Sequence, residues 1–539
     1  MGKRNYNVFF NTHTVSGIVI SVGLFIIFFT GSFSFFKEEI GSWQKGEKVN
    51  HGPISEVDCD GIIRKLHQEH NLNGRDLDIY FEGNLDVVRI SLGKTKDTIN
   101  NPEGTAGAYY YLNLKDFTTK DYYENYNLGE FLYRLHFLDP FVYPIGRYLA
   151  GLIAIFFVFA IITGTIVHWK KILPDFYSFN PRSMLKKMWT DAHTALGIIG
   201  LPFQFMYGIT GAFFIIGVLA LLPASILFNN DQQKMMEEMR PRLKTYEWKA
   251  MTSEKPLSVN TLIERTEDLW SGFNVETISV SNFGGADMKY TIYGELDTKK
   301  RFIGVGRVAY DAYSGKAMYE KDPNELNYLE DFQVVWGRLH FADFGGITTR
   351  IIYFIFGILT CFVIITGVLV YIEARNKKSM TLKQRLYTAR VGHIYLAICL
   401  SMLPVTALSF LFARITNGQF ESPQNAFYWF YFVTWGIFVL FYYVKRDNYF
   451  TNKNTLLLGA IFGSSVPIVN GITSGNWFWN TFAEGQYGIL SIDVLWTVIA
   501  AFSLLFYLTI RPGIKDKSTF AKNPIDYKAL KAEEAKVSR

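Results

Sequence analysis

The chain has 539 residues, of which 49% are hydrophobic, 17% are aromatic and only 19% are charged. These proportions exclude a soluble protein of this size with a single core and favour a polytopic membrane protein. The net charge of +6 carries little information by itself, because lysine and arginine cluster between the apolar stretches. The three cysteines form no CxxC motif and no even external set, which excludes a disulfide framework.

The first apolar stretch opens with the basic residues Lys3 and Arg4 and has no small-residue cleavage site. We therefore expect an uncleaved signal anchor that starts in the cytoplasm. The polar segment at 37–144 carries a helical pattern at 57–70, followed by three strand-like runs with turn residues between them. This order predicts a folded external domain.

The chain then repeats this arrangement. DAHTALGIIGLPFQFMYGITGAFF at 191–214 aligns without a gap on NTHTVSGIVISVGLFIIFFTGSFS at 11–34, and the polar segment at 223–348 repeats the order of helix and strands. Both polar segments return to the membrane through the motif RLHF, and the spans that follow both contain ITG. The sequence therefore predicts a duplicated unit of span, external domain, RLHF and span.

Four further apolar stretches follow without an external domain or RLHF, so we interpret them as an extension of the duplicated part. This gives eight spans with both termini in the cytoplasm. The predicted organisation is TM1 at 8–36, a first external domain at 37–144, TM2 at 145–169, a cytoplasmic loop at 170–190, TM3 at 191–222, a second external domain at 223–348, TM4 at 349–372, a cytoplasmic loop at 373–390, the four-span extension at 391–511 and a cytoplasmic tail at 512–539.

Six of the nine histidines lie at predicted membrane boundaries, where an ionisable group needs a partner or a function. Four occupy matched repeat positions: His13 and His193 at the inner side, and His136 and His340 at the outer side. Bis-histidine haem ligation requires such pairs, because the iron takes one neutral imidazole from each face of the macrocycle. We expect these four histidines to ligate two haem b groups, and not haem c, because no CxxCH occurs.

Glycines supply a second constraint. Two follow the inner histidines by four residues and share their helix face, and two follow by eighteen residues, or five whole turns. Two more lie near the inner ends of the second and fourth spans. Such positions leave room for a flat cofactor, although close helix packing needs glycine equally. The expected cofactor-facing glycines are Gly17, Gly31, Gly164, Gly197, Gly211 and Gly367.

Other side chains near these positions are candidate contacts. Arg134 and Arg338 each precede an outer histidine by two residues and are expected partners of haem propionates, with interfacial snorkelling as the alternative. His168 breaks the repeat, because Tyr371 occupies the matching position, yet it lies at the inner side. It is therefore the main rival ligand for the inner haem. His393, in the extension, is another.

These motifs resemble the PepSY-associated transmembrane family. The matching features are HTxxG with TG closing the same span, LHF followed in the second copy by DFGG, and ITG near the end of the second and fourth spans, over residues 8–375. The resemblance implies a bacterial inner-membrane protein with two periplasmic PepSY domains, each a helix packed on a small antiparallel sheet. It also implies ferric-siderophore reduction, with haem b between four spans on His13, His193, His136 and His340.

The leading hypothesis is therefore an electron-transfer enzyme that reduces a ferric siderophore, or another ferric chelate, and releases Fe(II). The sequence contains no GxGxxG or flavin motif, so quinol or a separate reductase must supply the electrons. A siderophore or peptide transporter is one alternative, although the repeats run parallel and no charge lies mid-span in the duplicated part. A PepSY-type binding or regulatory protein is another. We expect the lipid bilayer and the iron chelate as partners, and no nucleic acid.

Overall fold

The computed structural model describes most of the chain. The residues described are 2–49, 52, 54–81, 85–172, 174, 177, 185–220, 226, 228–231, 234–235, 237, 246–299, 301–377, 379–510 and 527–537. Most of the predicted loop at 170–190 and much of the predicted tail at 512–539 lie outside these residues.

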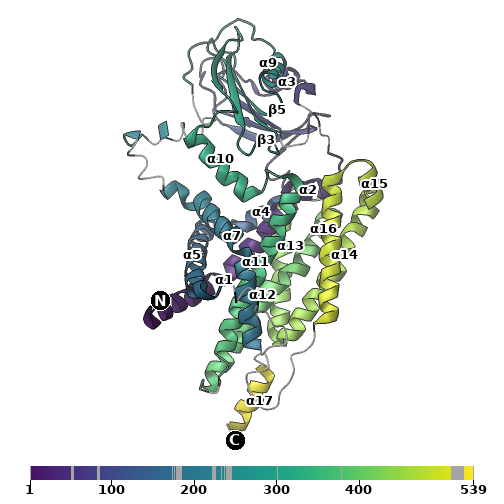
Figure 1. The fold of residues 1–539 in the computed structure, drawn as a ribbon. Coiled ribbons are helices and arrows are strands. Elements are labelled where there is room, and N and C mark those ends of the chain that lie inside the picture. Colours follow the sequence, from purple (N-terminus) through teal and green to yellow (C-terminus); the bar gives the residue numbers. More distant parts are fainter. Residues whose placement is uncertain are drawn as a thin grey trace. The chain divides into compact units, whose positions relative to one another are not determined.

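The chain forms two compact units, each built from several segments (Figure 1). The first, which we name the helical unit, comprises Met1–Glu47, Asn127–Ala220 and Arg350–Arg539. The second, the sheet unit, comprises Lys48–Tyr126 and Leu221–Thr349. The chain crosses between them repeatedly, which follows from the predicted alternation of apolar and polar segments.

Eight helices in the described part of the chain are long and apolar enough to cross a membrane. A helix satisfies its own backbone hydrogen bonds, which is what the hydrocarbon core requires. The eight predicted spans are confirmed, and the chain is a multi-pass membrane protein. These helices are α1 (Lys3–Ser34), α5 (Ile145–His168), α7 (Leu185–Ala220), α11 (Gly346–Ala374), α12 (Leu382–Ile415), α13 (Pro423–Lys445), α14 (Asn448–Ser474) and α16 (Tyr487–Thr509).

The helices extend beyond the apolar runs that predict them. The first helix of the extension, predicted from residue 391, begins at Leu382. Its start is fixed by a capping box, in which Thr381 and Gln384 bond reciprocally to each other's backbone N–H groups. The first turns of α12 are therefore polar and precede the apolar run that predicts the span. Shorter elements complete the helical unit: α2 (Lys37–Lys45), α4 (Leu128–His136), η2 (Trp169–Lys171), α15 (Phe478–Ala483) and α17 (Tyr527–Val537).

Buried polar bonds join the four-span extension to α2, the helix that follows α1. The indole Nε1 of Trp43 donates to Asp493 on α16 at 2.7 Å, and Asn470 on α14 donates to the other carboxylate oxygen at 2.8 Å. Arg414 on α12 donates to the carbonyl of Gln44 at 2.7 Å. Buried polar groups are costly without partners, so these mutual contacts fix the extension against the duplicated part.

The sheet unit contains one antiparallel sheet of eight strands in the order β4-β3-β2-β1-β5-β6-β7-β8. Each half contributes four strands preceded by a helix, one strand more than the three strand-like runs that the pattern predicts. The strands are β1 (Leu77–Phe81), β2 (Val87–Leu92), β3 (Ala108–Asn113), β4 (Thr119–Asp121), β5 (Phe273–Ser281), β6 (Lys289–Leu296), β7 (Val305–Asp311) and β8 (Ala317–Lys321). The helical elements are η1 (Ile54–Glu56), α3 (Cys59–His70), α9 (Val259–Leu269) and α10 (Tyr328–Phe341).

This single sheet differs from the two separate external domains that the sequence predicts. β1 pairs antiparallel with β5, with Leu77 opposite Val280 and Ile79 opposite Ile278. Separate domains would each leave an apolar edge strand with unpaired backbone N–H and C=O groups, and the pairing of β1 with β5 removes both edges.

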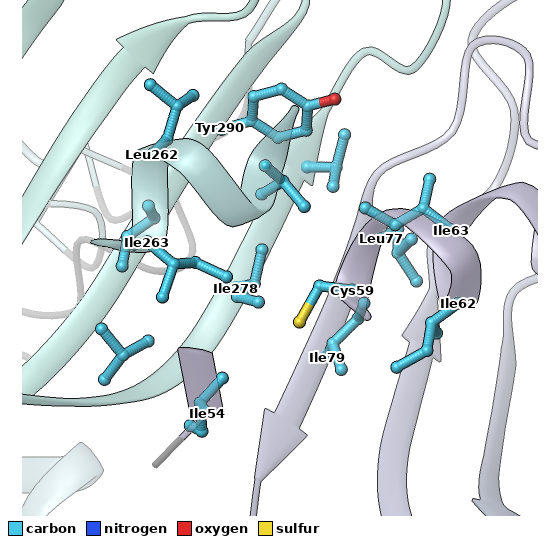
Figure 2. Close-up of a cluster of buried hydrophobic side chains, with 14 of the residues drawn as sticks. Ile54, Cys59, Ile62, Ile63, Leu77, Ile79, Leu262, Ile263, Ile278 and Tyr290 are labelled. Carbon is cyan, nitrogen blue, oxygen red and sulfur yellow. The ribbon is translucent and has the colours of Figure 1, made fainter. Parts of the chain in front are cut away.

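The two halves also share one core. Side chains of α3 and α9, such as Ile62 and Ile263, cluster with Ile79 and Ile278 of the two central strands (Figure 2). The N-terminal ends of α3 and α9 are also hydrogen-bonded to each other, because Asp60 accepts a hydrogen bond from the backbone N–H of Val259 at 2.9 Å. Neither half is therefore complete without the other.

We predict that Ile278→Ala destabilises both halves of the sheet. Ile278 is 0% exposed, and such a truncation costs about 2–5 kcal/mol. Hydrogen exchange of the full chain in detergent, read by mass spectrometry, should show lower protection in β1–β3 as well as in β5–β7. Ile99→Ala, at a side chain that is 86% exposed, is the control and should change protection by less than about 0.5 kcal/mol. Loss confined to β5–β8 would contradict the single core.

Candidate cofactor site

His13, on the first half of α1, lies against α5. Its ring nitrogen Nδ1 donates a hydrogen bond to the carbonyl oxygen of Ala160 at 2.8 Å. Gly164, one turn further along α5, lies beside the imidazole: a Cβ atom there would come within 2.9 Å of the Cε1 atom of His13. The absent side chain is what lets the ring approach the α5 backbone.

His193 repeats this arrangement between α7 and α11. Its Nδ1 donates to the carbonyl of Val363 at 2.9 Å, and a Cβ atom on Gly367 would lie 3.0 Å from its Cε1 atom. The carbonyl again precedes the glycine by four residues. The sequence match between the two copies therefore extends to the same contact in space.

His136, the last residue of α4, makes the same contact with α1. Its Nδ1 donates to the carbonyl of Ile27 at 2.7 Å, and a Cβ atom on Gly31 would lie 2.5 Å from that nitrogen. Helix α1 thus carries His13 near one end. Near its other end, Gly31 makes room for the imidazole ring of His136. The two histidine sites of α1 are separated by five turns, or roughly 27 Å.

These bonds fix the tautomer of the three histidines. A carbonyl oxygen can only accept, so Nδ1 must carry the hydrogen in each ring. In the neutral imidazole the other nitrogen, Nε2, then keeps its lone pair. In a metal-ligating histidine, the ring nitrogen that does not bind the metal usually donates its N–H in a hydrogen bond of this kind.

His13 and His193 are brought together. Their ring centroids lie 6.0 Å apart, and the ring planes are inclined at 55°. Two imidazoles bound at about 2 Å to one metal ion place their centroids roughly 6 Å apart. In the described part of the chain no set of three or more His, Cys, Asp or Glu side chains is placed to hold a metal. A metal between these two rings would therefore take two ligands from the described side chains.

The same helix faces carry two glycines whose Cβ positions are not blocked. A Cβ atom on Gly17, one turn from His13, would meet no atom of the described residues within 4 Å. A Cβ atom on Gly197, one turn from His193, would meet only Val363, at 3.9 Å. Paired neutral imidazoles beside side-chain-free positions fit the requirements of a macrocycle that supplies four equatorial ligands.

Comparison with known protein families identifies the family of this chain. The sequence profile of the PepSY-associated TM region covers residues 10–374. The chain belongs to this family. No curated protein matches the chain. The PepSY-associated TM region ends at the last residue of α11, Ala374, so the four-span extension lies outside it, as the motifs predict.

The two histidines of the predicted outer pair belong to different units. His136 belongs to the helical unit, whereas His340 lies on α10 of the sheet unit. Gly211, eighteen residues after His193 on α7, is the position that the repeat matches to Gly31. The joint ligation of one haem by His136 and His340, with Gly211 beside it, stays a prediction.

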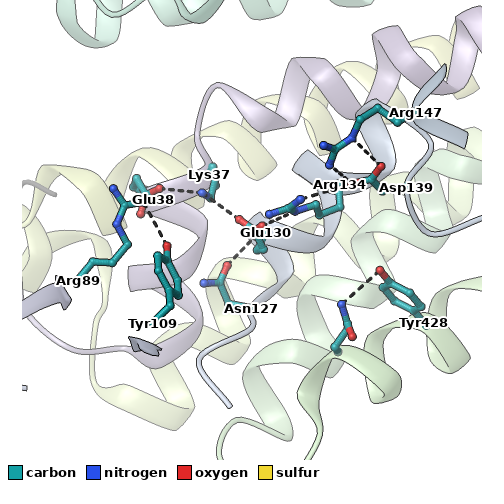
Figure 3. Close-up of polar contacts among 11 residues, drawn as sticks. Lys37, Glu38, Arg89, Tyr109, Asn127, Glu130, Arg134, Asp139, Arg147 and Tyr428 are labelled. Atoms are coloured by element: carbon teal, nitrogen blue, oxygen red, sulfur yellow. Dashed lines mark hydrogen bonds and ion pairs between the residues drawn. The ribbon is translucent and has the colours of Figure 1, made fainter. Parts of the chain in front are cut away.

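The arginines of both RLHF motifs bind carboxylates. Arg134 pairs with Glu130 at 2.6 Å and with Asp139 at 3.4 Å (Figure 3). Arg338 pairs with Glu295 and, at 3.2 Å, with Asp343. Burial alone would lower the pKa of Arg338, but Asp343 and Glu295 outweigh it and raise this pKa above its ordinary value. A propionate would have to compete with these carboxylates, and the propionate role of both arginines stays a prediction.

The two rival histidines occupy different surroundings. His168, the last residue of α5, lies close enough to His13 and His193 to act on both electrostatically. His393 lies on α12, where its Nδ1 is 2.7 Å from the amide oxygen of Asn448 on α14. Of the two, His168 is the one that the structure associates with the inner pair.

The sequence reasoning missed the charge network that holds α4. Glu130 is buried and also pairs with Lys37 on the helix after α1 at 2.9 Å, and Arg147 pairs with Asp139 at 2.5 Å (Figure 3). The signal was available, because Glu130 precedes Arg134 by four residues, the spacing of an ion pair on one helix face. This network positions the helix that carries His136.

We predict that Gly164→Leu and Gly367→Leu weaken binding of the inner cofactor. The new side chains would displace His13 or His193 from the carbonyl that each one bonds, and loss of such support costs about 10–100-fold in metal affinity. Titration of apoprotein with haem measures the effect. Gly436→Leu is the matched control, since a Cβ there meets no described atom within 4 Å. Equal affinity in all three variants would contradict the contact.

Proposed function

We propose that this protein is a di-haem electron-transfer enzyme of the bacterial inner membrane, which reduces a periplasmic ferric siderophore or other ferric chelate in iron uptake. The observation that carries the proposal is the approach of His13 and His193, with ring centroids 6.0 Å apart and each Nδ1 bonded to a backbone carbonyl. Only neutral imidazoles fixed in this tautomer present Nε2 to a metal.

The choice of a haem follows from the ligand count, and the absence of a CxxCH motif favours haem b over haem c. Two imidazoles alone leave a zinc or copper ion short of protein ligands, whereas a six-coordinate haem iron needs just two axial ones. When bound, haem b supplies a one-electron Fe(III)/Fe(II) couple. His13 and His193 would hold the iron, Gly17 and Gly197 would leave room for the ring, and the surrounding spans would exclude water.

The direction of electron flow follows from the distribution of positive charge. Short basic segments flank the His13 end of the spans, which is the cytoplasmic end by the positive-inside rule. His136 and the sheet unit would then face the periplasm, with both chain termini in the cytoplasm. The basic residues of these segments include Lys3, Arg4, Lys170, Lys186, Lys187, Arg375, Lys377, Lys383, Arg385, Lys445 and Arg446.

A second haem would be held at the periplasmic side by His136 and His340. His136 supports this because it makes the same carbonyl and glycine contact as the inner histidines. Electrons from quinol, or from a separate reductase, would enter at the inner pair and leave at the outer pair. Each electron converts one chelated Fe(III) to Fe(II), which hard oxygen ligands bind more weakly, so the iron is released.

We predict that dithionite-reduced protein is reoxidised by a ferric hydroxamate, with Fe(II) captured by a ferrous-specific chelator. In detergent the double variant His136→Ala/His340→Ala should react more slowly, because it lacks the exit site. His67→Ala is the matched control and should keep the wild-type rate, since His67 lies on α3 and its Nδ1 accepts from the N–H of Leu72. Equal rates in the wild type and the double variant would refute the outer pair as the exit site.

A further inference from the structure

One face of α7 carries a regular series of residues. His193, Gly197, Gly200 and Gln204 follow one another at intervals of four, three and four residues. At about 100° per residue they lie within an arc of about 60° around the helix axis. The cofactor ligand and the two glycines thus share a face with a polar side chain near the middle of the span.

This face is turned toward α11. The carbonyl of Val363 accepts the hydrogen bond from His193, and Leu359 lies 3.1 Å from the position of a Cβ on Gly200. Between them, beside Gly197, the nearest atom to such a Cβ is 3.9 Å away. A methyl group at Gly197 would therefore just touch α11, whereas the position of a Cβ on Gly200 is already occupied by Leu359 and Gln204.

Gln204 folds its amide back over Gly200. Its Nε2 atom lies 2.5 Å from the position that a Cβ on Gly200 would take, on the side of the helix turn that leads toward His193. The residue is 4% exposed, and among the described residues its Nε2 has no hydrogen-bond partner. A buried donor in the hydrocarbon region costs several kcal/mol unless something satisfies it.

The first copy lacks this amide. Leu24 on α1 occupies the position that aligns with Gln204, and it is buried as well. The fold of the unit therefore accepts an aliphatic side chain here. Only the second copy buries an amide at this position, which is unfavourable for folding. We infer that this amide has a function specific to α7.

We propose that Gln204 directs its amide N–H groups at the cofactor held between His13 and His193 and raises its reduction potential. The positive end of the N–H dipole stabilises the iron centre after it gains an electron, and the low dielectric of the span strengthens the effect. Gln204 is a positioning and tuning residue, and the claim rests on the proposed haem at this site.

The test is a redox titration of the inner haem, in a His136→Ala/His340→Ala background that isolates its absorbance. Gln204→Leu, which introduces the residue of the other copy, should lower the midpoint potential by about 59 mV for one electron. At a fixed applied potential this is about a tenfold lower ratio of reduced to oxidised haem. Gly200→Ala should act in the same direction, because the new methyl displaces the amide. Leu24→Met, at the aligned position of α1, is the control and should leave the potential unchanged.

The outcomes separate this inference from the proposed function. Colourless wild-type protein from haem-replete cells would overturn the proposed function, and this inference with it. Bound haem with the same potential in wild type, Gln204→Leu and Gly200→Ala would overturn the role of Gln204 alone. If Gln204→Leu loses its haem, Gln204→Met, which keeps the side-chain length without the N–H groups, decides the question by the same titration.

Discussion

The hydrogen bond from a histidine Nδ1 to a carbonyl of the neighbouring helix is the constraint on which the rest of this structure depends. It requires a glycine one turn beyond the carbonyl, because any Cβ there would meet the ring. The contact occurs three times among the described residues of the helical unit, with Ala160, Val363 and Ile27 as acceptors. It sets the register of α1 on α5, of α7 on α11 and of α4 on α1, and it leaves each Nε2 suited to a metal.

The two RLHF helices are held by different surroundings, although their motifs match. In the helical unit, α4 is fixed by Lys37, Arg134 and Arg147 around Glu130 and Asp139. In the sheet unit, α10 is fixed to the strands by ion pairs of Arg307 with Glu330, Lys321 with Asp331 and Arg338 with Glu295. Removing one partner of a buried ion pair leaves the other charge buried without compensation, which is costly. Each helix is therefore held firmly within its own unit.

Much of this could be predicted from the sequence, because the decisive signals are local. The eight spans follow from hydropathy, and the strands follow from the alternation of polar and apolar residues, for example in β1 and β2. The aligned His13 and His193 pointed to one shared site. The single sheet was not predictable in this way, since the pairing of Ile79 with Ile278 joins segments almost two hundred residues apart and leaves no periodic mark. Gln204 was missed for a similar reason: an isolated polar residue in a span becomes informative only when its burial and its hydrogen bonding are known.

An electron-microscopy map of the protein purified from haem-replete cells is the most direct test of cofactor binding by His13 and His193. We expect planar density between the two rings, with iron bonded to both Nε2 atoms and the ring edges over Gly17 and Gly197. Density in which the two imidazoles face an empty or lipid-filled gap, or in which His168 takes the place of His13 on the iron, would contradict it.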